Sequence, residues 1–284
     1  MPATGLHLAR VAGAIHLRRQ GTWSLLPDDA SFDSLLKLSV NELRGVLDTE
    51  RPAAFVRDSA VVGAPIDSQE VWAAGVTYQR SLEARADEAI SSDPYDRVYS
   101  AARPELFFKA THGRVRGPGE TLFIRSDSTW DVPEPELAVV CNSRLEVVGY
   151  TIGNDVSSRS IEGENPLYLP QAKVFDGCCG LGPAVALAWE FSPADRSIEL
   201  EIRRRGSVIY RSATSTSAIR RAIPELLDYL GRDQRFEAGC VLLTGTGIVP
   251  PSDFTLEDGD VVAIRIDGLG LLENPIHRHA RTNQ

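Results

Sequence analysis

The chain lacks the features that mark several classes of protein. No apolar run approaches the ~20 residues that span a bilayer, and residues 1–5 lack the apolar core of a signal peptide. The 284 residues carry a net charge of −9, which disfavours a nucleic-acid surface, because such a surface needs clustered lysine and arginine. We therefore expect a cytoplasmic protein with no membrane and no nucleic-acid partner.

Zinc ligands in a recognisable spacing are also missing. The five histidines show no H-x₃-H spacing, and the cysteines form no C-x-x-C pair. The cysteines lie mostly in apolar, strand-like contexts, which indicates reduced core residues: Cys141, Cys178, Cys179 and Cys240. A zinc site is not expected.

Two regions differ in pattern, and the length allows one large domain with a small one beside it. Residues 1–65 predict a small α/β domain, with strands at 6–11 and 14–18 and helical patterns at 32–38 and 41–47. Residues 66–284 would form the catalytic domain. We expect the N-terminal domain to serve packing or assembly.

The rest of the chain is mostly β. Two hairpins are predicted, at 197–203 with 207–211 and at 261–266 with 270–274, each around a glycine-containing turn. One helix is predicted near 219–230, where Pro224 marks the first turn of a shorter helix. Many short strands with few helices indicate a rolled mixed β-sandwich or barrel.

Three carboxylates are placed to meet on neighbouring strands. A strand at 135–141 is followed by a turn and a strand at 145–155. Glu134 and Glu136 share one face because side chains two apart on a strand point the same way, and the returning strand brings Asp155 beside them. Such a trio suits Mg²⁺ with positions open for water and substrate, and Mn²⁺ or Ca²⁺ would also fit all-oxygen ligands. The alternative is a solvated acidic face.

The surroundings of the trio favour chemistry. A polar run follows Asp155, and Lys173 stands alone in an apolar, glycine-rich neighbourhood. Polar groups set between buried strands tend to have a chemical role. Lys173 is the candidate for proton transfer, because burial and a nearby cation both lower the pKa of a lysine.

Several segments resemble the fumarylacetoacetate hydrolase superfamily, over roughly residues 70–275. The E-x-E and Asp pattern is common to the whole superfamily. The runs Pro104–Lys109 and Asn165–Gln171 resemble the branch that dehydrates sugar acids. The other matching segments are 71–78, 125–128, 133–140, 149–152, 155–159 and 244–250.

The resemblance implies a β-roll that holds the metal at one mouth and dehydrates a 2-keto-3-deoxy sugar acid, 2-dehydro-3-deoxy-D-arabinonate, to 2,5-dioxopentanoate. It places Lys173 and Glu105 at the catalytic site, and we expect them to act as base and acid respectively. An apolar setting raises the pKa of a carboxyl group, as an acid requires. It also implies a homodimer or homotetramer.

Further ligand contacts are predicted around this site. Thr244 and Thr246, in a glycine-rich turn, would hydrogen-bond the ligand, and the resemblance adds the backbone of Phe108 and Lys109. Residues 79–100 are polar with a thin apolar stripe, and we expect a lid that supplies Ser81, Arg80 or Arg85.

Two alternatives stay open. C–C hydrolases of the superfamily use a histidine in the loop after the 76–78 equivalent, and residues 76–100 contain none. That absence disfavours a hydrolase or decarboxylase acting on a 2,4-dioxo acid, although Glu105 could still activate a water. The third reading is a non-catalytic 2-oxo-acid binder, which the presence of both Lys173 and Glu105 disfavours.

Overall fold

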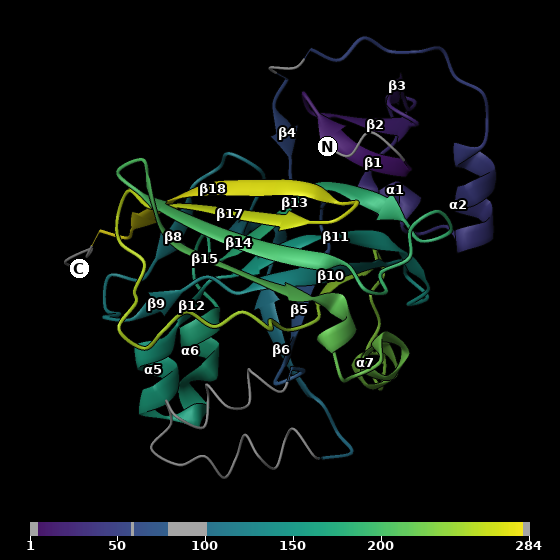
Figure 1. Ribbon diagram of the computed structural model, residues 1–284. Coiled ribbons are helices and arrows are strands. Elements are labelled where there is room, and N and C mark those ends of the chain that lie inside the picture. The colour runs from purple at the N-terminus through teal and green to yellow at the C-terminus, as the bar shows by residue number, and fades with distance from the viewer. Residues whose placement is uncertain (1–4, 58–59, 79–100, 281–284) are drawn as a thin grey trace.

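The computed structural model describes residues 5–57, 60–78 and 101–280. Most of the ordered elements are strands (Figure 1). Among these residues, no helix is both long and apolar enough to cross a membrane. The predicted mostly β class is confirmed.

A large mixed sheet forms the centre of the molecule, in the order β3-β2-β1-β13-β11-β10-β16-β5-β6, with β4 paired to β1 and β7 to β13. Its strands are β1 (Leu6–Val11), β2 (Ala14–Arg19), β3 (Thr22–Leu25), β4 (Val62–Gly63), β5 (Glu70–Gly75), β6 (Glu105–Ala110), β7 (Val115–Arg116), β10 (Pro135–Cys141), β11 (Val147–Asp155), β13 (Cys179–Leu187) and β16 (Cys240–Leu243).

A five-stranded sheet, in the order β15-β14-β17-β18-β8, lies across one face of the large sheet (Figure 1). Contacts of β14, β17 and β18 with β10, β11 and β13 join the two layers. Neither sheet closes on itself among the described residues, so no barrel forms there, and the sandwich is the observed alternative. The strands of this layer are β8 (Leu122–Ile124), β14 (Ser197–Arg204), β15 (Ser207–Ser215), β17 (Val261–Ile266) and β18 (Gly270–Arg278).

The central strands β10 and β11 form an antiparallel hairpin whose residues are buried almost throughout. Both faces of this hairpin are buried, which explains why its sequence is nearly continuously apolar rather than alternating. All four cysteines are free and buried, two of them in β10 and β16 and two at the start of β13.

Short helices stand at the end of the sheet where β11 finishes. A two-stranded ladder of β9 (Asp131–Val132) and β12 (Ser157–Ser158) leads into α5 (Arg159–Glu164), η2 (Pro166–Tyr168) and α6 (Leu169–Lys173). Helices α5 and α6 contact each other, and α6 also contacts β6 and β12. This packing brings the end of α6 against the end of β11.

The predicted helix near 219–230 begins later than its apolar pattern suggests. Helix α7 spans Ile223–Leu230 with Pro224 in its first turn, where proline has no hydrogen bond to lose. The shorter alternative is therefore confirmed. A short 3-10 helix, η3 (Thr216–Ala218), precedes α7 in the chain.

The N-terminal segment contains β1, β2, α1 (Phe32–Leu35) and α2 (Val40–Leu47), as its patterns predict. Strand β1 pairs with β13, so this segment extends the large sheet. The division of the chain at residue 65 stays a prediction.

Candidate metal centre

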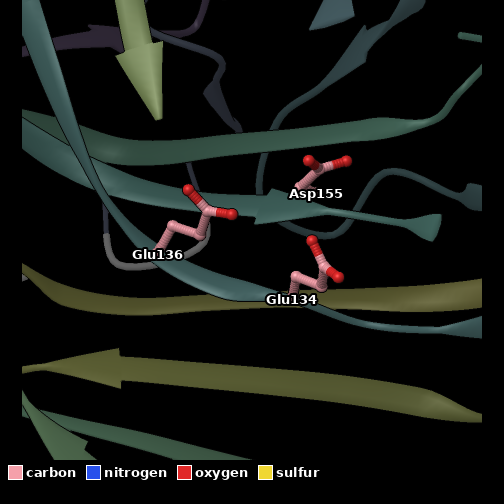
Figure 2. A group of neighbouring side chains, drawn as sticks. All are labelled: Glu134, Glu136 and Asp155. Atoms are coloured by element: carbon pink, nitrogen blue, oxygen red, sulfur yellow. The ribbon is translucent and has the colours of Figure 1, made fainter. Parts of the chain in front are cut away.

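Three carboxylates converge where β10 begins and β11 ends. Glu136 pairs with Gly153 in the ladder, and the Asp155 amide donates to the Glu134 carbonyl over 3.0 Å. One ligand oxygen of each of Glu134, Glu136 and Asp155 lies within 4.8 Å of the others. Figure 2 shows the three side chains turned toward one space. The hairpin geometry expected from the sequence is confirmed.

The trio is almost completely removed from solvent, with 1–3 % of each residue exposed. Burial raises the pKa of Glu136 well above its usual value, and the negative charges of Asp155 and Glu134 raise it further. The Gly245 amide, which donates to Glu136 Oε2, and the Lys173 ammonium act in the opposite direction. The arrangement therefore needs positive charge.

Lys173 supplies part of that charge. Its Nζ lies 2.7 Å from Glu134 Oε2 and 3.4 Å from Asp155 Oδ2, and it donates to Ser157 Oγ over 2.6 Å. The side chain is fully buried at the end of α6, with the Phe107 ring 5.5 Å from Nζ. The structure thus brings the predicted base into direct contact with two of the three predicted metal ligands.

Arg159 is a second cation at the trio, and the sequence analysis gave it no role. Its Nη2 donates to Glu134 Oε1 over 2.6 Å, and its Nη1 lies 3.5 Å from Glu162. Ser158 caps α5, which places Arg159 in the first turn facing the site. The sequence offered one signal for this role, because Arg159 is the single charged residue within the polar run after Asp155.

Glu105 stands on β6, paired in register with Gly75 of β5. Its Oε2 atom is buried and has no hydrogen-bond partner among the residues that the structure describes. A Cβ on Gly75 would lie 2.0 Å from that atom, so the absence of a side chain at Gly75 makes the room that the carboxylate occupies. Gly75 also lines the cavity of the carboxylate trio, which connects Glu105 to the site.

The other predicted contacts divide into three groups. Thr246 lines the cavity, as predicted, together with Gly245 and Phe107, which were not predicted, whereas Phe108 does not line it. The Thr244 hydroxyl donates to the Leu137 carbonyl over 2.9 Å, and its contact with a ligand stays a prediction. Three predicted contacts lie outside the described residues: Ser81, Arg80 and Arg85.

The Lys109 side chain is fully buried, and its Nζ lies 2.5 Å from Asp155 Oδ1. Burial opposes the charge of this ammonium, but the Asp155 carboxylate outweighs that effect and raises the pKa of Lys109 above its usual value. The sequence analysis considered only the backbone of this residue. Burial of a lysine side chain without a partner would be costly, so the burial of Lys109 itself indicates that its ammonium has one.

A hard divalent cation fits this donor set. All three groups offer carboxylate oxygens, and the cavity between them measures about 10 Å³, which compares with the ~10–15 Å³ that one water-sized sphere occupies. Opposite ligand oxygens lie ~4.2 Å apart across Mg²⁺ and ~4.8 Å apart across Ca²⁺. One oxygen of each carboxylate lies within 4.8 Å of the others, so the three are close enough to share one hard divalent cation.

Comparison with known proteins agrees with this geometry. The family "Fumarylacetoacetate (FAA) hydrolase C-terminal" matches residues 70–277. A probable 2-keto-3-deoxyxylonate dehydratase of Haloferax volcanii is 49 % identical over 253 residues, covering 88 % of this chain and 86 % of that protein. The 2-dehydro-3-deoxy-D-arabinonate dehydratase of Saccharolobus solfataricus is 44 % identical over 222 residues, covering 76 % of this chain and 74 % of that protein.

A solved structure is similar over nearly the whole chain. It is a 2-keto-3-deoxy-D-arabinonate dehydratase complexed with magnesium and 2,5-dioxopentanoate, at 35 % identity and a TM-score of 0.82, covering 97 % of this chain and 99 % of that one. A fumarylacetoacetate hydrolase from Exiguobacterium antarcticum, at 24 % identity and a TM-score of 0.73, shares the fold. The chain belongs to the fumarylacetoacetate hydrolase family.

Proposed function

We propose that this protein is a Mg²⁺-dependent dehydratase that converts 2-dehydro-3-deoxy-D-arabinonate, a 2-keto-3-deoxy sugar acid, to 2,5-dioxopentanoate and water. One observation carries the proposal. A fully buried amine, Lys173 Nζ, lies 2.7 Å from Glu134 within a trio of buried carboxylates. The names of the relatives at 49 % and 44 % identity support the same reaction.

Glu134, Glu136 and Asp155 would hold the cation. When bound, a divalent cation attracts the 2-oxo acid and stabilises the negative charge that develops on its keto oxygen, which acidifies the protons on C3. The Gly245 amide fixes Glu136 through Oε2, and Arg159 fixes Glu134 through Oε1, so two of the ligands are oriented by neighbouring donors.

Lys173 takes a proton from C3 in this proposal, and this step requires its neutral amine. A cation held by the trio would replace the positive charge that the ammonium supplies without it. Ser157 Oγ lies 2.6 Å from Nζ and orients the amine, and the Ser157 hydroxyl in turn lies 3.0 Å from the Asp155 carbonyl. Burial keeps bulk water from the amine, because none of the Lys173 side chain is exposed. These contacts favour a single position for the base.

Glu105 gives its proton to the C4 hydroxyl, which leaves as water. The C3–H and C4–O bonds break and a C3=C4 double bond forms. Proton shifts from C5 to C3 and from the C5 hydroxyl to C4 then yield the aldehyde. The buried Glu105 Oε2 atom, which no described residue hydrogen-bonds, is available for this proton transfer. The other ligand contacts remain proposals: Thr244, Thr246, the backbone of Phe108 and Lys109, and Ser81, Arg80 or Arg85.

The test is incubation of the protein with Mg²⁺ and 2-keto-3-deoxypentonate, with products followed by NMR. We expect 2,5-dioxopentanoate, no turnover in EDTA, and no turnover by Lys173→Ala. Lys37→Ala, a surface lysine variant, serves as the control. Release of pyruvate would point to C–C cleavage, and full turnover by Lys173→Ala would remove the lysine from the mechanism.

The assembly and the location are separate proposals. We propose a homodimer or homotetramer, because β15 is an edge strand that exposes Val208 and Ile209. Light scattering coupled to gel filtration measures the mass directly, and a monomer contradicts the proposal. The four free, buried cysteines support a cytoplasmic location, which fractionation of cells checks.

A further inference from the structure

Lysine is rare in this chain, and its placement is uneven. Only Lys37, Lys109 and Lys173 occur in 284 residues, whereas the other basic side chains are arginine. Lys37 is exposed, but Lys109 and Lys173 are both fully buried and both contact Asp155. The proposed mechanism uses the Lys173 amine and leaves the Lys109 ammonium without a role.

The Lys109 ammonium has three hydrogen-bond donors and three acceptors around it. Nζ lies 2.5 Å from Asp155 Oδ1, 2.9 Å from the Val156 carbonyl and 2.6 Å from the Lys173 carbonyl. The Phe175 ring lies 5.6 Å from Nζ. Three protein oxygens thus already surround the Lys109 ammonium, and Lys109 is not among the residues that line the cavity between the carboxylates.

We propose that the Lys109 side chain is a positioning residue that holds Asp155 and Lys173 in a fixed relation to each other. This inference rests on the proposed function. One ammonium contacts a carboxylate oxygen of a metal ligand and the main chain of the base. The Lys109 ammonium contacts Asp155 Oδ1. The other oxygen of the same carboxylate, Asp155 Oδ2, lies 3.4 Å from Lys173 Nζ.

The charge of Lys109 and its positioning role predict opposite effects on cation binding. Removal of a positive charge this close to the site strengthens cation binding if electrostatics alone decides. Loss of the positioning contact leaves Asp155 Oδ1 without its ion-pair partner and two buried carbonyls without their donor. Removing a partner that orients a metal ligand weakens metal affinity by ~10–100-fold. Whether the cation affinity rises or falls therefore distinguishes a purely electrostatic effect of Lys109 from its positioning role.

The experiment measures Mn²⁺ affinity in the absence of substrate, from the EPR signal of free Mn²⁺. Lys109→Met keeps the length of the side chain and removes its charge. We expect at least a tenfold loss of Mn²⁺ affinity with a native near-UV circular dichroism spectrum, partial rescue in Lys109→Arg, and no change in the surface control Lys37→Met. Unchanged or tighter binding by folded Lys109→Met overturns the proposal.

A second measurement on the wild-type protein covers the case in which Lys109→Met does not fold. With isotope-labelled lysine, three side-chain signals are expected, and saturating Mn²⁺ should broaden those of Lys109 and Lys173 but not that of Lys37. A Lys109 signal that Mn²⁺ leaves sharp overturns the proposal. Failure of the wild type to bind Mn²⁺ at all, or to form the aldehyde, instead refutes the proposed function.

Discussion

Replacement of Gly75 by alanine should disable the proposed acid without touching a charged group. The Cβ of alanine would stand 2.0 Å from Glu105 Oε2 and 2.6 Å from its carboxyl carbon, whereas ordinary contact begins at 3.4 Å. The carboxylate must therefore move by about 1.4 Å. A misplacement of ~1 Å can cost ~100-fold in rate when a reacting group depends on its position. We expect a similar fall in kcat.

The fold should tolerate this change. The clashing atoms belong to the flexible end of Glu105, which can turn aside, and alanine is ~0.5–1 kcal/mol better than glycine within a strand. We expect the free energy of unfolding in urea to stay within ~1 kcal/mol of the wild type. Mn²⁺ affinity should also stay unchanged, because Glu134, Glu136 and Asp155 are not displaced.

The assay follows aldehyde formation at saturating substrate in four proteins: the wild type, Gly75→Ala, Glu105→Ala and the double variant. Once Glu105 is removed, the alanine at 75 meets no carboxylate, so the double variant should be no slower than Glu105→Ala. Gly113→Ala is the matched control, since no heavy atom lies within 4 Å of its added Cβ. A kcat above one third of the wild type, or losses that multiply in the double variant, would refute the reasoning.

Three further predictions concern the surroundings of the site. Burial raises the pKa of Asp131 to about 6 against an ordinary 3.8, so its ionisation costs stability above pH 6 and that cost disappears as the pH falls toward 4. Asp131→Asn should therefore gain up to ~3 kcal/mol relative to the wild type between pH 4 and pH 7 in urea unfolding, and parallel pH profiles would contradict this. Gly245→Ala should lose more stability than Gly13→Ala, because both glycines have φ near +88° but only the first places a Cβ 2.0 Å from Thr77 Oγ1; equal losses would show that the backbone alone matters. Mg²⁺ at 100 times its Kd should raise the free energy of unfolding of the wild type by ~2.7 kcal/mol. Glu136→Gln should lose that increment while its metal-free form is at least as stable as the wild type, because burial beside two carboxylates already disfavours the ionised Glu136; a Mg²⁺ effect that survives the substitution would remove Glu136 from the ligand set.

Local sequence patterns were sufficient for the strands that carry the carboxylates. The predicted strand 135–141 matches β10, and the returning strand ends at Asp155 as expected. The reason is that residues two apart on a strand share a face, and a short turn returns the chain beside itself. The same local logic found β1, β2, α2 and both C-terminal hairpins. The sequence did not fix the residue at which α7 begins, because the apolar stripe extends to residues before that point.

Local patterns could not predict the contacts that Arg159 and Lys109 make with the carboxylates. Arg159 reaches Glu134 from the first turn of α5, 25 positions along the chain, and Lys109 reaches Asp155 from β6, 46 positions away. No periodicity links such residues, because their approach depends on how α5, α6 and β6 pack against the end of β11. The two threonines illustrate the same point: they are two apart, yet Thr246 lines the cavity and the Thr244 hydroxyl bonds to Leu137.

The many short strand-like runs of the sequence predicted the mostly β class of the fold. Spacing along two strands predicted that Glu134, Glu136 and Asp155 converge. Lys173, which lies on α6, was expected beside them from its surroundings in the sequence and from the family resemblance. Only the tertiary structure decided which cations accompany the acids, that Gly75 makes room for Glu105, and that a second buried lysine contacts both Asp155 and the main chain of Lys173. The physical reason is that a buried charge has to find its partner in space, and strand order, not sequence distance, sets which partner is near.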